Sequence, residues 1–144
     1  MNVAPRQRRL ATLAVVAIVL AACSGDPMPT HPSVASMGHR PSTSATVEIV
    51  QPAPSTTVTG STAHVVLRLN GATIVPDTTT NIRPDQGHVH LYVNNQLISM
   101  NYGLEQDIPV QPGTLVLKAE FVAADHAPFS PRVYSPETVF TVSP

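Results

Sequence analysis

The sequence predicts one all-β domain over residues 45–144. Apolar and polar residues alternate with a period of two in several short segments, and turn-forming residues separate those segments. No stretch after residue 22 shows a 3.6-residue apolar period over three turns. Strict alternation leaves one apolar face on each segment, which is typical of half-buried antiparallel strands. One hundred residues are enough for a single hydrophobic core.

The alternation predicts seven strands, at residues 46–50, 62–69, 88–93, 97–101, 105–110, 114–122 and 137–142. Asn70-Gly71 and Asn94-Asn95 tolerate the positive φ of tight turns, and Pro112-Gly113 makes a corner before the longest strand. About seven short strands at this spacing suit a single immunoglobulin-like antiparallel β-sandwich. The chain has no Trp and one Cys, which excludes an antibody-type domain with its buried Trp and disulfide.

Residues 1–22 have the features of a signal peptide. Three arginines precede residue 10, and residues 10–22 form an uncharged apolar run of 13 residues, which is shorter than the roughly 20 residues of a bilayer span. The run ends in Leu20-Ala21-Ala22-Cys23, which resembles the lipobox of bacterial lipoproteins. The resemblance implies cleavage before Cys23, a diacylglycerol thioether on its sulfur, and usually a third acyl chain such as palmitate on the new amino group. The alternative is an ordinary secretory signal in which the cysteine is incidental.

Two or more acyl chains hold a protein firmly on a membrane. We therefore expect this protein in the bacterial cell envelope, lipid-anchored on the extracytoplasmic side of the inner or outer membrane. Residues 23–44 would be the lipidated cysteine and a flexible linker, because this segment is rich in Pro, Ser and Thr and has no aromatic residue. Its two His and two Met residues allow a weak metal-capturing tail but lack the compact spacing of a ligand set.

Short motifs between residues 87 and 142 carry a second resemblance. They are Gly87-His88-Val89-His90-Leu91, Pro112-Gly113-Thr114-Leu115 and Asp125-His126-Ala127-Pro128-Phe129. In order and spacing they resemble a family of small secreted His-rich β-sandwich domains of unknown function. The family has histidines where Val89 and Leu115 stand here. The resemblance supports the sandwich fold and implies no activity.

Three histidines are the candidate site. His88 and His90 are two residues apart on one strand, so their side chains leave the same face. The strands that begin near His88 and Thr114 are expected to be antiparallel neighbours, which would bring His126 back over that face. Three imidazoles, with Asp125 or Met100 in reserve, would suit a zinc or copper ion. In the alternative, the strand histidines lie on a solvated face beside Tyr92 and His126 caps the turn at Asp125.

The proline-rich segment after Asp125 is expected to be a loop, and it has two interpretations. Phe129 and Tyr134 would form a partner-binding tip, or Phe129 would fold back and plug the open end of the core, which is our prediction. Glu105 and Asp107 are expected on an exposed strand face.

The remaining features predict no enzyme. The chain has no Gly-x-Ser-x-Gly, His-Glu-x-x-His, phosphate-binding glycine loop or acidic calcium loop. From Cys23 onward five basic and nine acidic residues give a formal net charge of −4, which argues against nucleic-acid binding. We expect a monomeric, non-catalytic binding or accessory domain for an envelope protein or polymer, without a cofactor. The alternative is a periplasmic copper- or zinc-binding protein that uses His88, His90 and His126.

Overall fold

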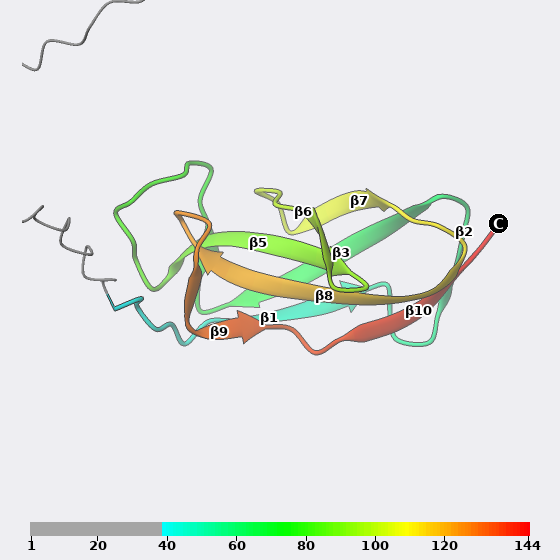
Figure 1. The fold of residues 1–144 in the computed structure, drawn as a ribbon, viewed down its shortest axis with the longest axis horizontal. Helices are drawn as coiled ribbons and strands as arrows, with labels where there is room; N and C mark the ends of the chain where they lie inside the picture. The colour runs from blue at the N-terminus through cyan, green and yellow to red at the C-terminus, as the bar shows by residue number, and fades with distance from the viewer. Residues whose placement is uncertain (1–38) are drawn as a thin grey trace, which may run out of the picture. The chain divides into compact units, whose positions relative to one another are not determined.

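The computed structural model describes residues 39–144. The predicted signal peptide, Cys23 and most of the predicted linker lie outside the described residues. Residues 39–144 contain ten strands and no helix (Figure 1). The strands are β1 (Thr46–Gln51), β2 (Thr57–Thr59), β3 (Thr62–Asn70), β4 (Thr73–Ile74), β5 (Gln86–Val93), β6 (Gln96–Ser99), β7 (Glu105–Pro109), β8 (Gly113–Ala123), β9 (Pro128–Tyr134) and β10 (Thr138–Ser143). In this part of the chain there is thus no helix long and apolar enough to cross a membrane.

The strands form two sheets that pack as a sandwich. The smaller sheet has the order β1-β3-β7, and the larger has the order β2-β10-β8-β5-β4. β6 pairs with the C-terminal part of β5, residues 91–93. β9 and β10 lie end to end along the same side of β8 (Figure 1). Pairing is antiparallel except for β2 with β10 and β4 with β5, which are parallel.

The core lies between the sheets and is made of the alternating apolar residues. Val47, Val65 and Ile108 from the smaller sheet face Leu91, Leu117 and Phe140 from the larger, and all six are buried. The all-β sandwich is therefore confirmed, and each of the seven predicted strands is present within two residues of its expected bounds.

Three strands were not expected from the sequence. β2 and β4 have only three and two residues, too few to show an alternation. β9 contains Pro128 and Pro131, which led us to predict a loop. It is a strand because it lies at the edge of the sheet, where a residue without a backbone N–H removes no ladder bond from an inner strand. Phe129 on β9 is buried and stacks on Phe121 with ring centroids 5.3 Å apart, which confirms that it plugs the core.

The start of the domain also differs from our expectation. The Pro, Ser and Thr content of residues 40–44 predicts that they belong to the flexible linker. In the structure the backbone N–H of Ser130 donates to the carbonyl of Pro41 at 3.0 Å, and Arg40 bonds to the turn between β8 and β9. These long-range hydrogen bonds attach the segment to the sandwich, so the packed domain begins before Ala45.

Candidate functional site

β5 carries two histidines on the face of the larger sheet that points away from the core. His88 and His90 alternate with Val89 and Leu91, which belong to the core, so the histidines leave the opposite face. Both are nevertheless buried, with 0 % and 6 % of their surface exposed. The expectation of a solvated sheet face is therefore wrong, because loops at this end of the sandwich cover the histidines.

His126 comes from the turn between β8 and β9. Because β8 runs antiparallel to β5, this turn lies beside the beginning of β5. Its backbone N–H donates to the carbonyl of Ala123 at 2.9 Å, and its φ is +62°. Its Nδ1 lies 3.2 Å from Nε2 of His90, and its ring stacks on that of His88 with centroids 4.3 Å apart. The structure thus brings together the three histidines that the sequence singled out.

The surrounding hydrogen bonds determine which ring nitrogens are free. Nε2 of His88 lies 3.2 Å from the carbonyl oxygen of Ala124, and a carbonyl only accepts, so Nε2 carries the proton. Nδ1 of His88 is then a buried lone pair, and it has no hydrogen-bond partner. Nε2 of His126 lies 3.1 Å from the hydroxyl of Thr78, which leaves Nδ1 of His126 directed at His90.

Two of the three rings are held neutral. Burial lowers the pKa of His88 below 6.5, with the carbonyls of Ala124 and Val75 acting in the opposite direction. Burial also lowers the pKa of His90, and the neighbouring His126 lowers it further. Both imidazoles are therefore uncharged near pH 7, which is the form that binds metal ions.

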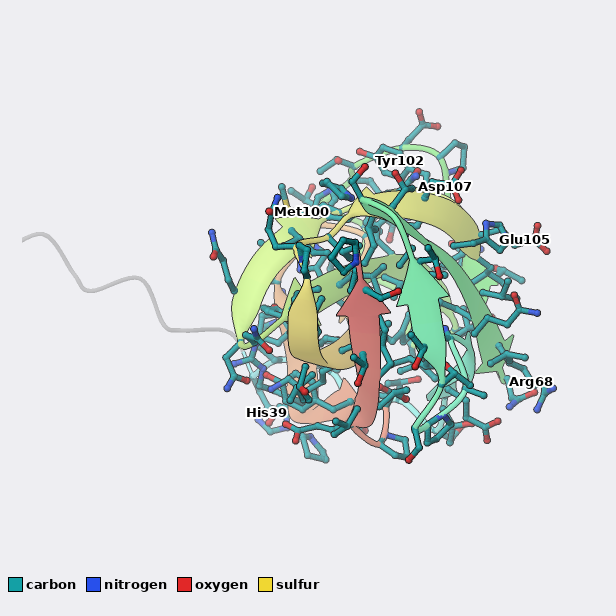
Figure 2. The ribbon with its side chains drawn as sticks, turned by 90° about the vertical axis from the view of Figure 1, so that its right-hand side faces the viewer. His39, Arg68, Met100, Tyr102, Glu105 and Asp107 are labelled. Atoms are coloured by element: carbon teal, nitrogen blue, oxygen red, sulfur yellow. The ribbon has the colours of Figure 1, made fainter. Side chains whose placement is uncertain are left out.

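Tyr102, in the loop between β6 and β7, covers the cluster on one side. Its ring meets that of His88 edge-on, with centroids 4.8 Å apart and an interplanar angle of 78°. The same loop carries Met100, which is half exposed (Figure 2). Tyr102 also borders an open, mostly apolar hollow of about 640 Å³, whose other lining residues include Leu69, Ala72, Ile74 and Leu104.

Asp125, which we held in reserve as a ligand, is engaged elsewhere. Its two carboxylate oxygens accept hydrogen bonds from the guanidinium of Arg40 at 2.6 and 2.9 Å. This hydrogen-bonded cation holds the pKa of Asp125 below its usual value. The carboxylate is thus paired with a cation instead of facing the histidines.

A second polar cluster lies beside the histidines and was missed from the sequence. Glu120 is directly opposite His90 in the β5–β8 pair and is fully buried. Its carboxylate accepts two hydrogen bonds from Arg132, at 2.6 and 2.8 Å, and one from the hydroxyl of Tyr92 at 2.8 Å. Burial, together with the bond to Glu120, raises the pKa of Tyr92 to about 12. The alternation placed Glu120 on the outer face of β8, but nothing in the sequence indicated that this face is covered.

Other predicted features lie at the surface. Glu105 and Asp107 are exposed on β7, as expected (Figure 2). Asp107 bonds to Nδ1 of His64 at 2.8 Å. Tyr134 is partly exposed, and the cations of Lys118 and Arg132 lie 5.0 and 5.1 Å from the centre of its ring.

The three histidines do not yet converge on a common point. His88 and His126 stack with an interplanar angle of 13°, so their nitrogens lie in nearly parallel planes. Among residues 39–144 no three His, Cys, Asp or Glu side chains are arranged, as they stand, to hold a metal ion. Coordination by all three rings would require the ring of His88 to turn about its Cβ–Cγ bond.

Comparisons with known proteins add little. No protein-family model matches the chain, and no curated protein matches it significantly. Among solved structures, an engineered protein from a structural genomics consortium is similar with a TM-score of 0.43 and 14 % identity. The match covers 69 % of this chain and 20 % of that one. A similarity at this level carries no argument about fold or function.

Proposed function

We propose that this protein is a lipid-anchored component of the bacterial cell envelope whose β-sandwich binds a copper or zinc ion through His88, His90 and His126. The observation that carries the proposal is a cluster of three imidazoles in which the ring of His126 contacts those of His88 and His90. The rings of His88 and His90 are buried and neutral, and Nδ1 of His88 has no hydrogen-bond partner. Leaving a buried polar atom without a partner costs about 1–3 kcal/mol. A bound ion would remove this cost at Nδ1 of His88.

The spacing of the nitrogens supports a metal ligand set. Two ligands about 2.0–2.1 Å from a tetrahedral ion are about 3.3 Å apart. Nε2 of His90 and Nδ1 of His126 are 3.2 Å apart, so their separation already matches that of two ligands, and a turn of the rings would direct both nitrogens at one ion. The ion would replace the hydrogen bond that these two nitrogens now share, and His88 would complete the set after rotation of its ring.

The ring nitrogens that would not bind the ion support the same assignment. Histidines that bind metal use their second ring nitrogen for a hydrogen bond that fixes the ring. Nε2 of His126 has such a bond with Thr78. Nε2 of His88 is now bonded to the carbonyl of Ala124 and would have to re-form a bond of this kind after its ring turns. The ligand atoms would be Nδ1 of His88, Nε2 of His90 and Nδ1 of His126. An imidazole-only set suits copper and zinc.

The accessory-domain interpretation has less support from the described surface. It expects an exposed aromatic patch that includes Tyr92, Tyr102, Phe129 or Tyr134. Phe129 is buried in the core, and the hydroxyl of Tyr92 is bonded to Glu120. Tyr102 and Tyr134 are 46 % and 40 % exposed, which leaves two of the four for such a contact.

Metal titration tests the proposed site. The full chain, purified in detergent, is expected to bind about one Zn²⁺ or Cu²⁺ per molecule with micromolar or tighter affinity. In a His88→Ala/His90→Ala variant the affinity for the ion should fall more than about 100-fold, because two of the three ligands are removed. His64→Ala is the matched control, since His64 is exposed on β3 and bonds to Asp107. A His31→Ala/His39→Ala variant controls for the linker. A flat titration of the unaltered chain would refute metal binding.

The lipid anchor has its own test. In bacterial cells labelled with radioactive palmitate, the unaltered chain is expected in the membrane fraction with incorporated label. Cys23→Ser removes the sulfur that would carry the diacylglycerol, so this variant should carry no label. Labelling that survives Cys23→Ser would contradict the anchor.

A further inference from the structure

One arginine holds the turn that carries His126. Arg40 donates from Nη1 and Nη2 to the two carboxylate oxygens of Asp125, at 2.6 and 2.9 Å. Nη2 also donates to the carbonyl of Ala127 at 2.9 Å, and Nε donates to that of Pro128 at 3.0 Å. These four hydrogen bonds fix the chain on both sides of His126. The side chains of Arg40 and Asp125 are only 31 % and 24 % exposed.

The turn needs this support. His126 has a φ of +62°, a conformation that costs a residue with a side chain about 1 kcal/mol or more. Within the turn, a backbone bond from Ala123 to the carbonyl of Ala127 at 3.0 Å adds to the bond from His126 to Ala123. Without the guanidinium, the carboxylate of Asp125 would be partly buried and would have no cation beside it. The carbonyls of Ala127 and Pro128 would each lose a donor at the same time, and the turn would keep only its internal bonds, among them that from the N–H of Ala127 to Asp125 at 3.1 Å.

We propose that Arg40 is a positioning residue that holds His126 against His88 and His90 and so preorganises the ligand set. This inference rests on the proposed metal-binding function. Arg40 also engages both oxygens of Asp125, which keeps that carboxylate away from the three imidazoles. Positive charge alone is insufficient for this role. The planar guanidinium donates to three residues at once from nitrogens in a fixed arrangement, whereas the ammonium of a lysine is a single compact donor group.

Three variants of the full chain in detergent test the inference by Zn²⁺ titration. Arg40→Gln and Arg40→Lys are both expected to weaken binding about 10-fold, as observed when groups that orient metal ligands are removed. Arg68→Gln is the matched control. Arg68 projects outward from β3 (Figure 2) and pairs with Glu48 at 3.1 Å on the exposed face, so its loss should leave the affinity unchanged.

Repeating the measurement in a His126→Ala chain distinguishes an effect of Arg40 on the position of His126 from a general effect on stability. If Arg40 acts through His126, Arg40→Gln should weaken Zn²⁺ binding no further in a His126→Ala chain. Loss of general stability would weaken binding in both backgrounds. In the metal-free protein, proton NMR should show contacts between the His126 ring and Thr78 that disappear in Arg40→Gln and persist in Arg68→Gln.

The outcomes distinguish this inference from the proposed function. If the unaltered chain binds no Zn²⁺ or Cu²⁺, the proposed function fails, and the NMR contacts of His126 alone decide whether Arg40 positions this ring. If the unaltered chain binds Zn²⁺ and Arg40→Lys binds equally well, the inference is overturned while the function stands. Persistence of the His126–Thr78 contacts in Arg40→Gln would overturn it as well.

Discussion

Gly87→Ala is expected to lower the free energy of unfolding by about 3 kcal/mol or more, the upper range for forced overpacking. Gly87 lies opposite Ala123, where the pairing of β5 with β8 begins. A Cβ at this position would lie 1.9 Å from the carbonyl oxygen of Val122 and 3.0 Å from the ring of Phe121. The first contact is with backbone, so the neighbouring strand would have to move, immediately beside His88.

The measurement is urea denaturation followed by far-ultraviolet circular dichroism, with Gly103→Ala as the matched control. A Cβ at Gly103 comes no closer than 3.4 Å to another residue, the carbonyl of Glu105. This control should change the free energy of unfolding by less than about 1 kcal/mol. If Gly87→Ala fails to fold, the control still shows that the loss is specific to the β5–β8 contact. A Gly87→Ala protein as stable as the control would show that the strands are not this close.

Arg132→Ala is expected to cost about 3 kcal/mol, because it leaves the fully buried carboxylate of Glu120 without its cation. The hydroxyl of Tyr92 would remain as one donor, which does not compensate a buried charge. The same denaturation experiment measures the effect. Arg68→Ala, which breaks an exposed pair with Glu48, should cost no more than about 1 kcal/mol.

A double substitution identifies the cause of the loss. Glu120→Gln/Arg132→Met removes both charges and keeps an acceptor for the hydroxyl of Tyr92. It should recover most of the stability lost in Arg132→Ala, because no uncompensated charge would remain at the buried position of residue 120. If Arg132→Ala is as mild as Arg68→Ala, Glu120 is solvated in solution.

The sequence predicts which side chains form the core between the two sheets. It does not predict that loops cover the side of β5 and β8 that points away from the core. Alternation around Val89 and Leu91 determines which side of β5 enters the core, and antiparallel pairing then brings His126 near His88 and His90. Burial of these histidines depends on loop residues such as Thr78 and Tyr102, whose packing leaves no periodic signal.

The positions missed share a similar cause. Glu120 and Arg132 are twelve residues apart and on different strands, and a charged residue on an outer face usually remains solvated. Arg40 lies in a segment whose composition is typical of a linker, and its partner Asp125 is 85 residues away. Contacts of this range depend on the assembled fold.

The position of β10 between β2 and β8 has a consequence for how the protein is made. β2 pairs only with β10 among the described strands, and residues 113–117 of β8 take β10 as their partner on that edge. Because a chain emerges N-terminal part first from the ribosome, and again when it is exported across a membrane, these edges stay open until residues 138–143 have emerged. The larger sheet is therefore completed late, by closing a loop of some eighty residues back to β2, a slow kind of step that leaves strand edges open to aggregation in the meantime.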